Sequence, residues 1–399
     1  MFTLNQNEFV PQIPYGTRDF LPREASRKRA IEAALAGMFV RWGYDEVVTP
    51  TIEYLDTLTL GAGCEVQQNL FKFFDKNNHL LALRPDMTTP IARVAASRLR
   101  ESPLPLKLFY LTNVFRYEQA QAGRQCEFYQ AGVELMGAAG PTGDAEVIAL
   151  AVESMREAGL AEFQISLGQV EFINGIMEES GLALQQRQQV KLAMLTRDLV
   201  GLGEILAISG LSREVQHLLQ RIPVWHGRED MLDQALTMVT NEKSRGALAN
   251  LAEIYQLLKV YGVEQYVTFD LGIIRDFDYY TGMVFEGYTP GLGFPLCGGG
   301  RYDQMLNSFG AGAPATGFAL GIERIMLALE RQGKTDKAEA KNFYVAWPSG
   351  RLAAAITKAG QLRKSGYSVE VACQAQTERE AAASQTDKGF ERLIYLTED

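Results

Sequence analysis

Residues 115–134 read "FRYEQAQAGRQCEFYQAGVE", which combines a strand-like pattern with many hydrogen-bonding side chains. Apolar residues such as Phe115, Phe128 and Val133 separate polar ones on both sides of Gly123, and this pattern predicts two strands joined by a turn. The polar residues of the pair are Arg116, Glu118, Arg124, Gln130 and Glu134. They fit either a solvated sheet face with weak exposed ion pairs or a pocket for a small charged ligand.

Length and composition indicate a folded protein of two or three domains. The chain has 399 residues, of which 47% are hydrophobic and 22% are charged, as in ordinary globular proteins. Neither a secretory leader nor an apolar run of about 18 residues is evident, so we expect a cytoplasmic protein without a membrane span. The formal net charge of -9 is a mild argument against a free-standing nucleic-acid binder.

Cysteine and histidine usage gives little support to metal or nucleophile chemistry. The four cysteines are far apart and lack CxxC spacing, so we expect reduced thiols and no metal site. Only three histidines are present, and none has an obvious nucleophile beside it. We therefore expect no catalytic histidine and no cofactor.

Local patterns predict the elements of the first half of the chain. A helix is expected from about Glu24 to Trp42, ending at Gly43. The runs "LFKFF" and "LLAL", joined by "DKNNH", predict a hairpin. In "LRPDMTTP" a strand gives way to a helix after Pro85, with polar side chains near the helix start.

The second half contains a helix-rich segment and a separate α/β pattern. From about Val170 to Tyr261 helix formers dominate, which predicts a helical insertion. The polar stretch "KTDKAEAKN" predicts a linker. The sequence after this linker alternates strand and helix signals, as in a small three-stranded α/β domain.

Two glycine-rich stretches do not fit nucleotide-binding fingerprints. "CGGGRYD" lacks the GxxxxGK[ST] spacing, and "GLGFPLCGG" is not followed by the helix and acidic residue of a dinucleotide site. Taken alone, such glycines are explained more simply by a tight bend or by close strand packing than by a nucleotide-binding loop.

Five polar clusters lie in segments with a strand-like pattern: "LRPDMTTP", "FRYEQAQAGR", "FYQAGVE", "RDFDYYTG" and "GGGRYD" with "GFALGIER". Taken together and in this order, they resemble the core of histidyl-tRNA synthetase, a class II aminoacyl-tRNA synthetase. The resemblance covers most of residues 14–331. It implies an α+β fold with a class II antiparallel sheet flanked by helices, a helical insertion at about 170–262 within a domain of residues 1–335, and a small C-terminal α/β domain at 341–399.

The resemblance also implies where ligands bind. Arg116, Glu118 and Arg324 match the family's nucleotide-binding residues, and here they would form a vestigial nucleotide site. Asp86, Thr88 and Gln130 would surround the α-amino group of histidine, and Glu134 and Tyr280 would face its imidazole. Arg275 would meet the carboxylate or phosphate, Tyr302 would close the pocket, and Arg116 would also contribute to it.

Departures from the synthetase pattern argue against amino-acid activation. Asp86 and Met87 replace a Glu-Gly pair, Cys126 replaces an arginine, and Asp276 places a negative charge beside Arg275. The C-terminal part resembles only a shortened anticodon-binding domain. Loss of a cation near the expected triphosphate weakens the case for ATP activation.

"LRPDMT", the retained pocket and the short tail together resemble the regulatory subunits of ATP phosphoribosyltransferase, which are paralogues of the synthetase. This resemblance implies a non-catalytic subunit that joins a short-form catalytic subunit in the first step of histidine biosynthesis. It also implies histidine as feedback effector and a self-dimer within a hetero-oligomer, without tRNA. An active synthetase with a reduced anticodon domain and a stand-alone histidine-activating enzyme are the alternatives.

Overall fold

The computed structural model describes residues 12–60, 69–117, 125–273, 280–310, 312–334 and 341–397. The chain divides into two compact units, one made mainly of residues 28–334 and the other mainly of residues 335–399. Glu118 and Arg275 of the expected site lie outside the described residues. The domain limits expected from the sequence stay a prediction.

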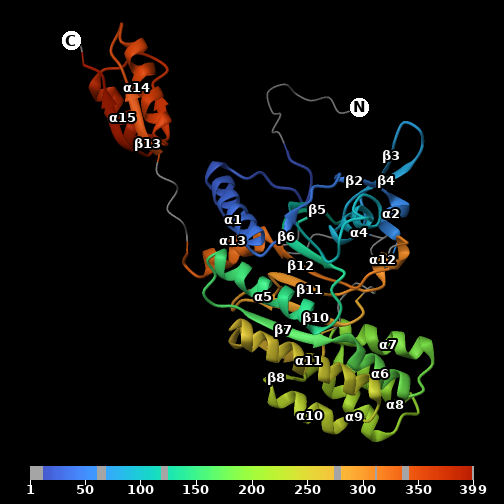
Figure 1. Cartoon of the computed structure of the whole chain (residues 1–399). Helices are drawn as coiled ribbons and strands as arrows, with labels where there is room; N and C mark the ends of the chain where they lie inside the picture. Colours follow the sequence, from blue (N-terminus) through green and yellow to red (C-terminus); the bar gives the residue numbers. More distant parts are fainter. Residues whose placement is uncertain are drawn as a thin grey trace. The chain divides into compact units, whose positions relative to one another are not determined.

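One mixed sheet organises the larger unit (Figure 1). Among the described residues its strand order is β1-β5-β6-β12-β11-β10-β7-β9-β8. The bounds are β1 Asp45–Glu46, β5 Leu106–Phe115, β6 Glu127–Met136, β12 Ala315–Gly321, β11 Cys297–Arg301, β10 Met283–Tyr288, β7 Gln164–Gln169, β9 Val267–Asp270 and β8 His226–Gly227. The strands from β5 across to β7 pair antiparallel, whereas β1 and β9 add in parallel. The expected class II antiparallel sheet flanked by helices is confirmed.

The two faces of the sheet are covered differently. Helices against it are α1 Pro22–Arg41, α4 Thr88–Ser97, α5 Pro141–Glu157, α12 Met305–Ser308 and α13 Ile322–Arg331. Ala131, Val133 and Leu135 of β6 are buried in the main core with side chains of α1, α5 and α13. Because side chains alternate along a strand, Gln130 and Glu134 face the other side, where α4 and α12 form a smaller apolar cluster.

A helical segment follows β7 and packs beside it (Figure 1). It consists of α6 Val170–Glu179, α7 Leu184–Leu195, α8 Leu199–Ala207, α9 Arg213–Arg221, η1 Ile222–Val224, α10 Asp230–Met238 and α11 Glu242–Tyr261, and η2 Glu264–Tyr266 leads out of it into β9. Local capping sets the starts of α11 and α8, since the side chain of Asn241 accepts the Ser244 N–H at 2.7 Å and that of Asp198 accepts the Gly201 N–H at 2.8 Å. α11 ends at Gly262, whose φ of 71° is left-handed. The short strand β8 inside this segment was not expected from the sequence.

A small three-stranded sheet precedes the pocket-forming strands. It pairs β2 Ile52–Tyr54, β4 Leu80–Leu83 and β3 Lys72–Phe74 in antiparallel fashion, and α2 Leu55–Thr59 follows β2. The expected "LFKFF" and "LLAL" hairpin is therefore present. After β4 the chain passes through Arg84 and Pro85 into α4, which brings Asp86 and Thr88 to the sheet.

The smaller unit is a parallel three-stranded sheet with two helices. The order is β14 Val369–Val371, β13 Lys341–Ala346, β15 Phe390–Tyr395. α14 Leu352–Lys364 and α15 Glu378–Asp387 connect these strands. The α15 start has a capping box in which Thr377 and Glu380 each accept the other's backbone N–H. This confirms the α/β pattern expected after the linker.

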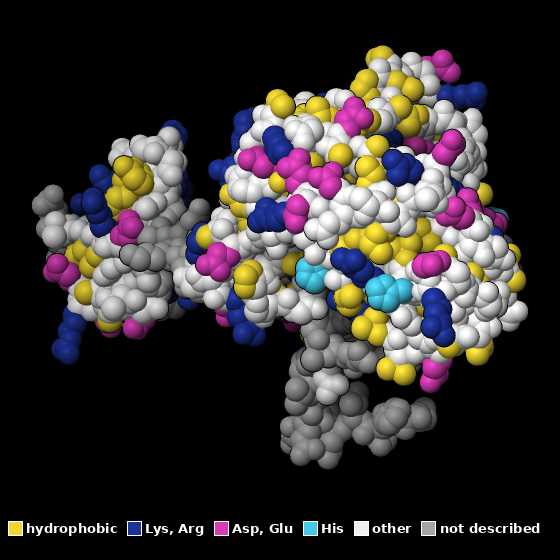
Figure 2. Space-filling model, turned by 90° about the horizontal axis from the view of Figure 1, so that it is seen from below, with side chains coloured by type: hydrophobic (Ala, Val, Ile, Leu, Met, Phe, Trp, Pro, Cys, Tyr) yellow, Lys and Arg dark blue, Asp and Glu magenta, His cyan; other side chains and the backbone are white. Residues whose placement is uncertain are grey.

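Charged side chains of both signs are mixed on the face shown in Figure 2. There Lys and Arg alternate with Asp and Glu, and apolar side chains lie between them. The described residues contain no helix that is long and apolar enough to cross a membrane.

Candidate functional site

A cavity of about 150 Å³ opens on the sheet face beside α4. Buried cavities of this size accept a single small molecule. The lining residues come from β5, β6, β11, β12 and α13, from the start of α4, and from the segments next to β5, β6, β10 and β11. Those predicted from the sequence are Asp86, Thr88, Arg116, Gln130, Glu134, Tyr280, Tyr302 and Arg324.

Small residues on neighbouring strands make the floor of the cavity. Gly132 is the cross-strand partner of Ala319, and Gly317 is the partner of both Glu134 and Gly300. All of them belong to the face on which Glu134 lies. Since none has a long side chain, a depression remains over β12 that larger side chains surround.

Two of these glycines are required because other side chains lie across them. A Cβ at Gly317 would lie 2.0 Å from Oε2 of Glu134, and one at Gly132 would lie 2.4 Å from the hydroxyl oxygen of Tyr110. Neither distance is possible for real atoms. The glycines of "GFALG" and "QAGVE" therefore allow Glu134 and Tyr110 to cross the sheet and reach the cavity.

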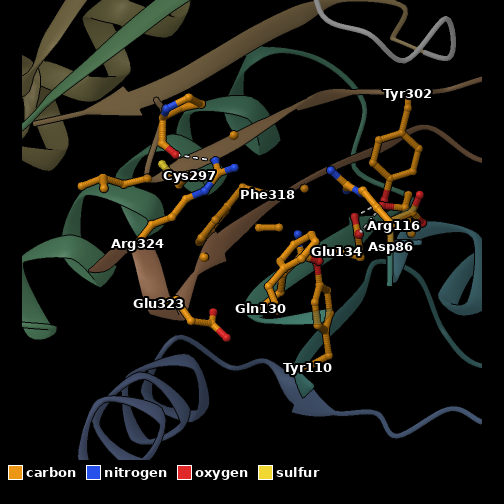
Figure 3. A pocket seen from close by; sticks show the side chains of 18 of the residues that line it. Asp86, Tyr110, Arg116, Gln130, Glu134, Cys297, Tyr302, Phe318, Glu323 and Arg324 are labelled. Atoms are coloured by element: carbon orange, nitrogen blue, oxygen red, sulfur yellow. Dashed lines mark hydrogen bonds between the residues drawn. The ribbon is translucent and has the colours of Figure 1, made fainter. Parts of the chain in front are cut away.

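Glu134 is the most enclosed acidic group of the cavity. Its residue is 2% exposed, Thr88 Oγ1 donates to Oε1 at 2.9 Å, and the Tyr302 hydroxyl donates to Oε2. Burial raises the pKa of Glu134 to about 8, although both hydroxyl donors lower it, and the charge of Asp86 raises it further. Figure 3 shows Tyr302 and Glu134 facing each other at one end of the cavity.

Asp86 and Arg116 lie next to this group (Figure 3). Asp86 accepts the backbone N–H of Thr89 at 3.3 Å in the first turn of α4, and burial raises its pKa against the opposing charge of Arg116. Arg116 Nε donates to the Pro85 carbonyl at 2.9 Å, and its guanidinium lies 5.3 Å from the Phe128 ring centroid. The pair presents one negative and one positive group to a ligand.

Gln130 provides a polar atom that the described residues leave unsatisfied. Its Oε1 is buried and has no hydrogen-bond partner among them, while the residue as a whole is 9% exposed. Buried acceptors without partners are rare because desolvation costs free energy. A bound donor would remove this cost.

The far end of the cavity carries the synthetase-like arginine. Arg324 Nη1 donates to the Pro295 carbonyl at 2.6 Å, and its guanidinium lies 5.2 Å from the Phe294 ring centroid. The neighbouring Glu323 accepts the Tyr129 N–H at 3.0 Å and so joins α13 to β6. Arg324 and Arg116 thus contribute to one cavity, as Figure 3 shows.

Buried polar contacts hold the supporting elements. Arg301 of β11 and Asp144 of α5 form an ion pair in which Nη2 and Oδ1 are 2.8 Å apart, with side-chain exposures of 8% and 1%. Arg84 donates from Nη1 to the Thr49 carbonyl at 2.9 Å and from Nε to the Asn113 carbonyl at 3.0 Å. These contacts fix the chain just before Tyr302 and just before Asp86.

The cavity brings together eight predicted residues and some that sequence reasoning missed. The missed ones include Tyr110, Gln125, Phe128, Cys297, Phe318 and Glu323. Tyr110 could have been found from its place opposite Gly132, but only with the strand register known. Thr88 was expected near an amino group, whereas its hydroxyl contacts Glu134.

No metal-binding cluster and no disulfide is seen within the described ranges. They contain no group of three His, Cys, Asp or Glu side chains placed to hold a metal. No disulfide joins Cys126, Cys297 and Cys373 to one another. The polar side chains that line the cavity carry carboxyl, guanidinium, amide and hydroxyl groups.

Comparison with known proteins connects this cavity to a family. The histidyl-tRNA synthetase family profile matches residues 16–325. An ATP phosphoribosyltransferase regulatory subunit from Desulforamulus reducens is 43% identical over 385 residues, which are 96% of this chain and 95% of that protein. One from Moorella thermoacetica is 45% identical over 380 residues, 95% of this chain and 96% of that protein.

The chain belongs to the family of ATP phosphoribosyltransferase regulatory subunits. The expectation of a regulatory rather than a catalytic subunit is thereby confirmed, as is the relationship to histidyl-tRNA synthetase.

Solved structures agree with this placement. A structure described as an ATP phosphoribosyltransferase regulatory subunit/histidyl-tRNA synthetase from Bacillus halodurans has a TM-score of 0.88 and 34% identity, covering 97% of this chain and 98% of that one. Histidyl-tRNA synthetase from Nostoc sp. PCC 7120 has a TM-score of 0.83 at 20% identity, covering 98% of this chain and 92% of that one. The second likeness shows the fold alone.

Proposed function

We propose that this chain is the histidine-responsive regulatory subunit of an ATP phosphoribosyltransferase, that it supports a short-form catalytic subunit in the first step of histidine biosynthesis, and that histidine bound in the cavity mediates feedback inhibition. It acts as a self-dimer within a hetero-oligomer and binds no tRNA. The chain itself performs no catalytic step.

The unsatisfied Gln130 oxygen beside two buried carboxyls is the observation that carries this proposal. Asp86 and Gln130 supply acceptors for an α-ammonium group. Arg116, and Arg275 by resemblance, supply donors for a carboxylate. Glu134 and Tyr280 face the side chain, and a polar site of this kind rejects an analogue that leaves its buried groups unpaired.

Regulation follows from differential binding. Histidine favours the arrangement of the hetero-oligomer in which the catalytic subunit is inactive. The coupling between histidine binding and the state of the catalytic subunit must be reciprocal, so the state of the partner changes the affinity for histidine by the same factor. A ligand with equal affinity for both arrangements would shift nothing.

The test is the turnover of a purified short-form catalytic subunit from the same source. We expect low activity alone, stimulation by this chain, and reversal of that stimulation by histidine. Glu134→Gln should weaken inhibition while keeping stimulation, and Glu153→Gln, on the solvent side of α5, serves as the matched control. Stimulation that histidine does not reverse would remove the feedback role.

An active synthetase is separated from this proposal by a second assay. Histidine-dependent exchange between ATP and pyrophosphate requires adenylate formation. We expect none above background, because Cys126 and Asp276 stand at the positions where the family's pattern has an arginine and a glycine. Exchange at a synthetase-like rate would contradict the regulatory proposal.

A further inference from the structure

The hydroxyl groups around Glu134 are arranged for an ionised carboxylate. Thr88 donates to Oε1 at 2.9 Å and Tyr302 donates to Oε2, so each carboxylate oxygen accepts one hydrogen bond. Hydrogen bonds of this kind favour the charged form. The α4 start and the segment after β11 thus preorganise the site for a negative charge.

Among the described residues, Glu134 has no cationic partner of its own to compensate for burial. Within the described part of the chain no Lys, Arg or His forms an ion pair with Glu134, and Arg116 acts on Asp86 instead. The titratable groups that face or couple to Glu134 come from several elements: Asp86, Tyr110, Tyr280, Tyr302, Arg116 and, from the core side, Tyr44. Burial raises the pKa of Glu134 to about 8 despite its two hydroxyl donors, which favours the neutral carboxyl at pH 7 before a ligand binds.

We propose that the cavity is specific for an amino acid with a basic ring, and that in the complex one proton is shared between that ring and Glu134. This rests on the proposed histidine site and adds the charge state of the ligand. The proton on the Glu134 carboxyl passes to the free ring nitrogen of a neutral imidazole. The products are a carboxylate held by Thr88 and Tyr302 and an imidazolium held by that carboxylate, so no proton is exchanged with solvent near pH 7.

Affinity therefore depends on pH in a defined way. Free imidazole has a pKa of ~6.5, and burial raises the pKa of Glu134 to about 8. Between these values the free components carry the one proton that the complex needs. Below this window binding must release a proton, and above it binding must take one up, so affinity falls about tenfold per pH unit on each side.

Isothermal titration of histidine into wild type and Glu134→Gln from pH 5.5 to 9.5 tests this inference. The α-ammonium of histidine also titrates at alkaline pH, but equally for both proteins. The ratio of the two affinities should therefore be constant from about pH 6.5 to 8 and fall about tenfold per unit above it. A ratio that stays constant to pH 9.5 would overturn the shared proton while leaving histidine binding intact.

A second variant and a second ligand keep the test independent of folding defects. Tyr302→Phe removes one donor that lowers the Glu134 pKa, so the alkaline fall should move to higher pH; no movement would count against the geometry. 1,2,4-Triazole-3-alanine, a similar amino acid with a far weaker ring base, should lose at least about tenfold in affinity for wild type and much less for Glu134→Gln. No histidine binding at any pH, with the catalytic subunit present, would instead remove the proposed function itself.

Discussion

Replacement of Asp144 by alanine should strongly destabilise the larger unit, because it removes the buried counter-ion of Arg301 and leaves only Asp303, whose Oδ1 lies 3.0 Å from Nη1 of Arg301. Asp144 on α5 is 1% exposed in its side chain, and Arg301 on β11 is 8% exposed. Arg301 Nε lies 3.0 and 3.1 Å from the two carboxylate oxygens, and Nη2 lies 2.8 Å from Oδ1. Removing one member of a buried pair costs ~3–5 kcal/mol.

An exposed pair on the same helix provides the matched control. Arg156 Nη1 and Glu153 Oε1 are 2.6 Å apart, with side-chain exposures of 49% and 34%. Glu153→Ala should cost only ~0.2–1 kcal/mol, since water screens such pairs. Because the helix, the residue types and the distances are similar in the two pairs, the difference between the two variants measures the effect of burial.

Urea unfolding followed by tryptophan fluorescence measures both variants. Trp347 belongs to the smaller unit, so all proteins should carry Trp347→Phe and leave Trp42 and Trp225 to report on the larger unit. A loss below ~1 kcal/mol for Asp144→Ala, with unchanged denaturant dependence, would refute the claim that this pair fixes β11. Arg301 precedes Tyr302, and histidine affinity should therefore fall in the same variant.

Three further predictions concern the cavity. Gly317→Ala should abolish histidine binding and cost ~1–3 kcal/mol of stability, because the added Cβ would lie 2.0 Å from Oε2 of Glu134; Gly360→Ala, which meets nothing within 4 Å in α14, should bind normally in the same titration. Glu134→Ala should weaken histidine binding by ~1–3 kcal/mol with a native circular dichroism spectrum, and unchanged inhibition would place the sensor elsewhere. Burial raises the pKa of Glu134 to about 8 from ~4.3 in an unfolded chain, so its contribution to stability is full below pH ~4.3 and decreases as pH rises towards 8. Urea midpoints of wild type relative to Glu134→Gln should accordingly fall between pH 5 and pH 8, and a relative rise would contradict the raised pKa.

Local patterns in the sequence were sufficient for elements whose formation depends on neighbours along the chain. The helix beginning near Glu24 was expected to end at Gly43, and α1 spans Pro22–Arg41. The hairpin of β3 and β4 follows from two apolar runs around a polar turn. Capping residues such as Asn241 and Thr377 act within four residues, so their effect can be predicted from the local sequence.

The register of the strands and the contacts between segments far apart in the sequence could not be predicted from local patterns. Tyr110 enters the cavity because it lies opposite Gly132, and a shift of one residue would turn it to the core. Strand β8 has only two residues, and its pairing with β9 supplies its hydrogen bonds. Eight of the predicted site residues line the cavity, and they were named through resemblance to a family, since composition and spacing left two interpretations of the polar hairpin. Their role in binding stays a prediction.

The sequence by itself determined which residue types are present and which short segments are helical or extended, because these depend on local sterics and on the period of apolar side chains. Only the tertiary structure decided that Thr88 and Tyr302 both contact Glu134, which lies 46 positions from Thr88 and 168 positions from Tyr302 along the chain. It also set the pKa of Glu134, because burial and the distance to other charges are properties of the packed sheet and not of the neighbouring sequence.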